Sequence, residues 1–299
     1  MADVDRLLIE TSRTFALAIP RLPEPLRREV GVAYLLFRIA DTFEDATRWP
    51  KKERIGALAE FDELLKNPTP GEAKRLADRW VKARPCDHEG YLNLLAETPG
   101  VMDELAGFAP TRRAAIIKHT LRTSEGMAGF VASGGEDGSL RLASLRELKH
   151  YCFIVAGIVG ELLTDLFLDF TPSLATAKKA LWDNAIQFGE GLQLVNILKD
   201  ANSDAKDGRV YLPPGLPRSD ILALAREDLR CATDYVLALQ TAGAPQGVVS
   251  FTALPVVLAE ATLRTIEQHG SGKSISRADV MTLVGRLDHA LESGAPALA

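Results

Sequence analysis

We expect the chain to fold as an all-α protein, and three observations lead to that prediction. Apolar residues recur with the period of a helix along most of the 299 residues. No stretch alternates convincingly between apolar and polar residues, as a half-buried strand does. Several of the periodic stretches are preceded by a helix start signal, either a proline in the first turn or a serine followed three residues later by an acid. The pattern predicts about ten helices and no solenoid repeat.

Composition excludes several classes of protein. The chain has 35 lysines and arginines against 40 aspartates and glutamates, a net charge of −5, so no basic patch indicates a nucleic-acid partner. Its three cysteines, Cys86, Cys152 and Cys231, are far apart and match no zinc spacing, which fits a reducing compartment. Nothing marks a linker, and we expect one domain over residues 1–299.

No transmembrane segment is expected. The first residues carry acids such as Asp5 where a secretion signal would be cationic and then apolar. The apolar runs 153–160 and 251–259 are too short to cross a bilayer, because Glu161 and Pro255 interrupt or end them. These features predict a cytoplasmic protein that at most associates peripherally with a membrane.

The first informative helix has Pro25 in its first turn and runs to about Asp45. Its residues Tyr34, Arg38, Asp41 and Asp45 follow one another at i, i+4, i+7 and i+11, and so form a polar stripe. Arg38 stands in the most apolar part of the helix. Its charge is satisfied either by an ion pair with a nearby aspartate or by a ligand.

The helix expected after Pro50 shows little chemistry, and in the helix expected after Pro110 the small residues Gly126, Ala128 and Gly129 allow close approach to the backbone. The helix that begins at Ser144 has Glu147 three residues later, as in a capping box. It is apolar nearly all round over 151–167 and should be central. Its small residues either allow close helix packing or make room for a long apolar ligand; they are Ala156, Gly157 and Gly160.

A second polar stripe lies on a helix that starts before residue 189. About 100° per residue places its members within a sector of roughly 80°; they are Gly189, Gln193, Asn196, Asp200 and Asp204. Two carboxylates one turn apart repel each other, and a helix tolerates them where a cation such as Mg²⁺ lies between them. The same four-residue spacing in the first stripe makes two solvated helix faces a poor explanation.

The helix is followed by a Pro/Gly loop and by further helices. Arg209 and Tyr211, in the loop, either close over an anion or are ordinary loop surface. The last helix is expected to have Ser276 as its N-cap.

Five segments, in register, resemble the squalene and phytoene synthase family. They read SRTF at 12–15, YLLFRIADTFED at 34–45, SEGMAGF at 124–130, YCFIVAGIVGELL at 151–163, and FGEGLQLVNILKD with DGRVYLP over 188–213. The resemblance runs from about residue 12 to about residue 270. It implies a single all-α isoprenoid-synthase domain with helices around a central cavity, and head-to-head coupling of two prenyl diphosphates.

The resemblance also assigns roles by position. It implies a Mg²⁺ site made by Asp41, Asp45, Asn196, Asp200 and Asp204. It places catalytic functions on Tyr151, Arg38 and Tyr34. Diphosphate-binding positions would be Ser12, Thr14, Tyr34, Arg38, Gln193, Asn196, Lys199 and Arg209.

Within the family, the segments DTFED and YCFIVAGIVG are more similar to the sequences of the squalene branch. This predicts that two farnesyl diphosphates pass through presqualene diphosphate to squalene, with NADPH as the hydride donor. Bulky Ile154, Ile158 and Leu162 favour a fifteen-carbon chain. The alternatives are phytoene or dehydrosqualene by proton loss, hydroxysqualene by water capture, and a non-catalytic lipid-binding relative. No dinucleotide fingerprint is visible, so NADPH rests on the resemblance.

Some features depart from the family pattern. Ser203 stands where an acid is frequent and Lys199 where arginine is frequent, so the second stripe is expected to hold metal less strongly. The membrane-anchoring tail of the eukaryotic squalene synthases is expected to be missing. Other isoprenoid enzymes fit less well. A head-to-tail synthase would show a DDxxD run and a terpene cyclase an Asn, Ser/Thr, Glu metal triad, and neither matches DTFED and DANSD.

Overall fold

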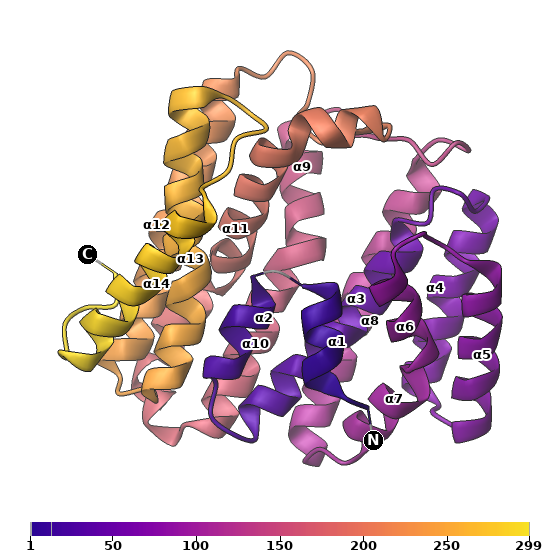
Figure 1. Cartoon of the computed structure of the whole chain (residues 1–299), viewed down its shortest axis with the longest axis horizontal. Coiled ribbons are helices and arrows are strands. Elements are labelled where there is room, and N and C mark those ends of the chain that lie inside the picture. Colours follow the sequence, from indigo (N-terminus) through magenta and orange to yellow (C-terminus); the bar gives the residue numbers. More distant parts are fainter. Residues whose placement is uncertain (1, 13, 299) are drawn as a thin grey trace. The chain divides into compact units, whose positions relative to one another are not determined.

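The computed structural model describes residues 2–12 and 14–298, and in this part of the chain almost all regular structure is helical. The all-α prediction is confirmed (Figure 1). The two strands, β1 (Leu140–Arg141) and β2 (Arg209–Val210), have two residues each and pair with one another.

Contacts divide the chain into two compact units. Unit 1 comprises Met1–Ile19 and Glu24–Leu140, and unit 2 comprises Pro20–Pro23 and Arg141–Ala299. The single domain expected over residues 1–299 stays a prediction. The first polar stripe belongs to unit 1, and the second belongs to unit 2 together with Tyr151 and Arg209.

Unit 1 is a set of antiparallel and crossing helices joined by short turns. They are α1 (Val4–Thr11), α2 (Phe15–Ala18), α3 (Leu26–Glu44), α4 (Lys51–Lys66), α5 (Pro70–Ala83), α6 (Glu89–Ala96), α7 (Thr98–Ala106) and α8 (Pro110–Ser133). Helix α3 packs against α1, α4, α6, α7 and α8 and is the central element. Leu35, Leu36 and Ile39 on α3 are fully buried, so burial of one apolar face fixes where the polar face of the same helix points.

Unit 2 contains the longest helix among the described residues. This helix is α11 (Lys178–Lys206), and the other helices of the unit are α9 (Leu145–Cys152), α10 (Ile158–Phe170), α12 (Arg218–Thr241), α13 (Gln246–His269) and α14 (Arg277–Glu292). Short 3₁₀ turns occur at Ile19–Arg21 and Pro172–Ala177. Helix α11 is central and packs along most of α12 and against α10 and α13.

The continuous α-helix expected over 151–167 is wrong at one point. A π turn, η2 (Phe153–Gly157), separates α9 from α10. A π turn carries one more residue than an α turn, so it rotates the side chains that follow it relative to those before it. Ile154 and Ile158, on either side of this shift, are both buried.

The small residues of this segment serve close packing against α11. A Cβ added at Gly160 would overlap the carbonyl oxygen of Ala185, and one added at Gly189 would overlap that of Ala156. Backbones approach this closely only where the side chain is absent. Of the two interpretations open for these residues, the structure therefore supports close helix packing.

The helix starts largely agree with the sequence. The Ser276 side chain accepts from the N–H of Asp279, and the two form a full capping box. Ser144 likewise accepts from the N–H of Glu147. The Glu147 carboxylate, however, accepts from the N–H of Ala143 at 2.8 Å, so it reaches one residue beyond the N-cap.

Two helical stretches, Leu145–Phe170 and Gln246–His269, are long and apolar enough to cross a membrane by length and composition alone. The apolar runs 153–160 and 251–259 were expected to be too short to cross a bilayer. That expectation is wrong for the length of the helices that contain them, because these helices continue through Glu161 and Pro255. Within the fold, 61% and 67% of the two apolar windows are buried. A mostly buried core helix can be as long and as apolar as a membrane-spanning helix.

Candidate functional site

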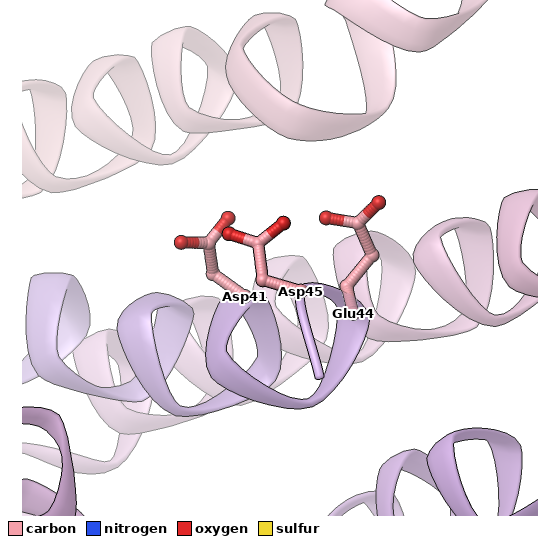
Figure 2. Close-up of side chains that lie close together, drawn as sticks. All are labelled: Asp41, Glu44 and Asp45. Carbon is pink, nitrogen blue, oxygen red and sulfur yellow. The ribbon is translucent and has the colours of Figure 1, made fainter. Parts of the chain in front are cut away.

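Three carboxylates gather at the end of α3. The side chains of Asp41, Glu44 and Asp45 rise from one side of the helix, and one oxygen of each lies within 4.8 Å of the others (Figure 2). Glu44 is buried, Asp41 is half-buried and Asp45 is exposed at the C-cap. Three carboxylates with hard oxygen atoms this close match the ligand chemistry of Mg²⁺, which also keeps water or phosphate oxygens in its coordination shell.

Glu44 is a member of this carboxylate cluster that was not predicted from the sequence. It lies three residues after Asp41, and residues three apart share a helix face as residues four apart do. The i,i+3 spacing was thus a usable signal. The sequence analysis considered only the two aspartates, because it compared the four-residue spacing of the two stripes.

Arg38 contributes a positive charge next to this carboxylate cluster. Its guanidinium forms an ion pair with Asp41 through Nη1 and donates to the Tyr34 hydroxyl through Nη2 at 3.2 Å. Burial lowers the pKa of the Arg38 guanidinium, but the charge of Asp41 together with Tyr34 and Tyr91 outweighs burial, so its pKa is raised. The ion pair predicted as one of the two explanations for Arg38 is present.

The segment between α1 and α2 reaches the same region of unit 1. The Tyr34 hydroxyl donates to the backbone oxygen of Thr11 at 2.9 Å. Ser12 follows as the C-cap of α1, and its Oγ accepts from the N–H of Phe15 at 3.0 Å. Thr14 is the N-cap of α2 and makes no side-chain capping bond. The structure therefore brings Ser12 and Tyr34 near one another.

Two more aromatic residues belong to this region, and the sequence analysis gave neither a role. The Tyr91 ring lies against the Arg38 guanidinium, and His88 stacks on Tyr91. Both lie on or next to α6, about fifty residues after Arg38 in the chain. Local spacing carries no signal for a contact of this length.

The second stripe lies on α11 as the helical period predicts. Gln193, Asp200 and Asp204 are half-buried and Asn196 is exposed, whereas Leu194, Val195 and Leu198 are buried. The helix continues through Asp204 to Lys206.

Lys199 lies between members of this stripe. Its Nζ is 3.2 Å from an Asp200 carboxylate oxygen and 3.5 Å from the amide oxygen of Asn196. An ammonium group in this place neutralises a carboxylate that a metal would use. Among the described residues, a group of three acidic ligands lies on α3. The weaker metal binding expected of the second stripe stays a prediction.

Tyr151 meets the loop after α11. Its hydroxyl donates to the Tyr211 hydroxyl at 3.2 Å, and the two ring centroids are 4.7 Å apart. Arg209 donates to the same Tyr211 oxygen from Nη1 at 3.1 Å. Tyr151 and Tyr211 are both buried. Three residues from two segments thus form one hydrogen-bonded chain, and Tyr211 is its central member.

Unit 2 also contains a pair of buried carboxyl groups. Glu190 on α11 and Asp228 on α12 are 8% and 5% exposed. Burial raises the pKa of Glu190 to about 7, assisted by the charge of Asp228. Burial also raises the pKa of Asp228 to about 6, against the opposing charge of Lys149. The sequence analysis gave neither residue a function.

Known proteins resemble this chain in sequence and in fold. The model of the family "Squalene/phytoene synthase" matches residues 8–216, a range that contains every candidate site residue and extends across both units. The squalene synthase of Eremothecium gossypii is 29% identical over 286 residues, which cover 87% of this chain and 61% of the relative. The squalene synthase ERG9 of Candida albicans strain SC5314 is 32% identical over 208 residues, covering 69% and 44%.

These curated relatives are longer proteins, and the chain spans about three fifths or less of their length. Among solved structures, a complex of TcSQS with the ligand E5700 superposes with a TM-score of 0.74 at 23% identity, covering 97% of this chain and 88% of that one. A dehydrosqualene synthase with a ligand superposes with a TM-score of 0.55 at 18% identity, covering 97% and 95%. At these identities the likeness concerns the fold.

Proposed function

This chain belongs to the squalene/phytoene synthase family, and on that premise we propose that it couples two prenyl diphosphates head-to-head. The proposed substrate is farnesyl diphosphate, used twice, and the proposed product is squalene, formed through presqualene diphosphate. The observation that carries the proposal is the cluster of Asp41, Glu44 and Asp45 beside the Arg38 guanidinium. A diphosphate held by a hard cation needs this combination of acidic ligands and a fixed positive charge.

Mg²⁺ is the proposed cofactor, and its ligands would be Asp41, Glu44 and Asp45, with Asn196, Asp200 and Asp204 as a second set. When bound, Mg²⁺ would supply positive charge that polarises the diphosphate leaving group. The oxygen-only ligand set of the first cluster fits a hard cation of this kind.

The side chains of the first stripe would bind and orient the leaving diphosphate. Arg38 would donate N–H groups to its oxygens and stabilise the charge that builds there as the carbon–oxygen bond breaks. Tyr34 would keep the guanidinium in place through the hydrogen bond at 3.2 Å. Ser12, Thr14, Gln193, Lys199 and Arg209 are proposed as further diphosphate contacts.

The residues near Tyr151 would handle the carbocation. The allylic cation left by diphosphate departure is attacked by the double bond of the second prenyl chain, and water must be kept away from it. We assign this to the apolar side chains that follow Tyr151 on η2 and α10, of which Ile154, Ile158 and Leu162 are buried. The Tyr151 hydroxyl, fixed by Tyr211, would present its oxygen to developing positive charge.

The last step decides the product. Hydride transfer from NADPH would give squalene, water would give hydroxysqualene, and proton loss would give dehydrosqualene or, from the twenty-carbon substrate, phytoene. The squalene synthases among the relatives support the first ending. The fold shared with a dehydrosqualene synthase keeps proton loss as the second candidate.

One experiment tests the proposal. The purified chain is incubated with farnesyl or geranylgeranyl diphosphate and Mg²⁺, with and without NADPH, and the apolar products are identified by mass. Squalene formed only with farnesyl diphosphate, Mg²⁺ and NADPH is the expected result. Presqualene diphosphate or hydroxysqualene despite NADPH would contradict the reductive step alone, and faster coupling of geranylgeranyl diphosphate would contradict the chain length. Absence of diphosphate release with either substrate would contradict catalysis and indicate a non-catalytic lipid-binding relative.

A further inference from the structure

We infer that Tyr91 is a positioning residue for Arg38, whose aromatic ring holds the guanidinium in the orientation that meets the diphosphate. The inference rests on the proposed function, because there Arg38 is the cation that stabilises the leaving group. Tyr91 lies near the start of α6 and belongs to none of the five segments that resemble the family.

The guanidinium of Arg38 has two tyrosine rings as close neighbours. Its Cζ lies 5.4 Å from the centroid of the Tyr91 ring and 5.6 Å from that of Tyr34. Both distances are within the roughly 6 Å over which a cation is attracted to the negative face of an aromatic ring. Tyr34 and Arg38 share α3, so α6 contributes Tyr91 as the neighbour from a different helix.

The two rings are themselves held by further aromatic contacts. Tyr91 stacks on His88 with centroids 4.1 Å apart and an interplanar angle of 24°. Tyr34 packs against Phe15 with centroids 5.4 Å apart. The five side chains form an aromatic column within unit 1, in the order His88, Tyr91, Arg38, Tyr34 and Phe15. Contacts with the neighbouring rings restrict the orientation of Tyr91 and Tyr34, and this restriction extends to the guanidinium that lies against them.

The Tyr91 ring stabilises the Arg38 guanidinium without adding a negative charge beside it. Arg38 Nη1 faces Asp41 and Nη2 faces the Tyr34 hydroxyl, whereas the buried Nε has no hydrogen-bond partner among the described residues. The ring face compensates part of the cost of burying this charge. Because the ring carries no net charge, it does not compete with phosphate oxygens for the guanidinium, as a second carboxylate would.

The hydroxyl of Tyr91 does not alter this balance. Burial raises its pKa, although the Arg38 charge opposes the shift, so the phenol stays neutral at physiological pH. A phenolate here would compete with an anionic substrate for the same guanidinium. The neutral ring attracts the cation and gives it an orientation without competing for it.

The test uses Mg²⁺ with inorganic pyrophosphate as the probe and calorimetry as the measurement, on the full chain. Tyr91→Leu removes the ring, and we expect about tenfold weaker pyrophosphate binding. Tyr91→Phe keeps the ring, and we expect binding within about twofold of the unchanged protein. In an Arg38→Gln background, Tyr91→Leu should cause no further loss, because the two residues act as one unit. An equal loss with and without Arg38, or a loss in Tyr91→Phe as large as in Tyr91→Leu, would overturn the inference.

Two further measurements keep the outcome unambiguous. Thermal unfolding of each variant reports whether it is folded, and should Tyr91→Leu fail to fold, His88→Ala takes its place because His88 is exposed and supports Tyr91. We then expect a two- to threefold loss that requires Arg38, and no loss would contradict the inference. A protein that binds pyrophosphate with Mg²⁺ but couples no prenyl diphosphate would contradict the proposed function. The coupling between Tyr91 and Arg38 could still be measured in that case, because it is obtained from pyrophosphate binding alone.

Discussion

The hydroxyl of Tyr151 donates to the hydroxyl of Tyr211 across 60 residues of sequence, at 3.2 Å. Tyr211 also accepts from Arg209 at 3.1 Å. The Tyr211 oxygen thus accepts two hydrogen bonds, one from each neighbour. This arrangement holds the Tyr151 oxygen in one place, as stabilisation of a short-lived cation requires.

The first prediction concerns the Tyr151 hydroxyl. Tyr151→Phe should lower kcat by about tenfold or more and leave KM for farnesyl diphosphate within about twofold, because the interaction forms in the transition state. Product formation under steady-state conditions gives both constants. Tyr235→Phe is the matched control, since it removes another buried hydroxyl in unit 2 that contacts Thr164 at 2.9 Å. Unchanged kcat with a raised KM in Tyr151→Phe would contradict the role.

The second prediction concerns the aspartates of the proposed metal site. Asp41→Asn, Asp45→Asn and Asp200→Asn should each reduce coupling by about a hundredfold or more while the protein stays folded. Asp45 is exposed, and its removal relieves repulsion within the cluster, so the free energy of unfolding without metal should be unchanged or slightly higher. Asp41→Asn also removes the ion pair with Arg38, so no such gain is expected there. Near-normal turnover in any of the three would count against the metal assignment.

The third prediction concerns Glu44, the carboxylate that the sequence analysis missed. Glu44→Gln should raise the Mg²⁺ concentration needed for half-maximal activity several-fold, because an amide oxygen is a weaker ligand than a carboxylate. A Mg²⁺ titration of coupling activity measures this. Glu53→Gln, at an exposed position in the first turn of α4, is the control and should leave the titration unchanged. Identical titrations for the two variants would exclude Glu44 from the site.

The fourth prediction is a pH dependence of stability from Glu190 and Asp228. Both pKa values are raised by burial, to about 7 and about 6, from ordinary values of 4.5 and 3.8. The folded protein therefore binds more protons than the unfolded chain between about pH 4 and pH 7, and the free energy of unfolding falls as pH rises through this range.

Urea unfolding at pH 5 and pH 8 measures this effect. Glu190→Gln should reduce the difference between the two pH values by an amount on the order of 2 kcal/mol. Asp62, buried in unit 1 with a pKa of about 6, titrates in the same range, so the comparison is made between the variant and the unchanged protein. An undiminished difference would show that Glu190 ionises normally.

The fifth prediction concerns the close packing of η2 on α11. Gly189→Ala should destabilise the protein by about 3 kcal/mol or more, since the new methyl group would overlap the carbonyl oxygen of Ala156. Gly285→Ala is the matched control, because Gly285 lies inside α14 with nothing within 4 Å of its Cβ position. There the better helix propensity of alanine should raise stability by about 0.5–1 kcal/mol. Equal effects of the two substitutions on chemical unfolding would contradict the packing.

The sequence by itself determined the helices and both polar stripes. Each of these depends on residues three to eleven positions apart, and the helical period converts that spacing directly into a shared face. The stripe from Tyr34 to Asp45 and the stripe from Gln193 to Asp204 could therefore be predicted on their helices. The same local information was enough to show the resemblance to the family.

Only the tertiary structure decided which residues from distant segments meet. The Tyr91 ring on Arg38 and the Tyr211 hydroxyl on Tyr151 join helices or loops that no short-range period relates. The π turn after Cys152 was equally invisible, because its extra residue leaves the apolar pattern intact. Whether Gly160 makes room for a ligand or for a neighbouring backbone likewise depended on what lies opposite it. The carbonyl oxygen of Ala185 lies there, and packing of one helix against another determines such contacts.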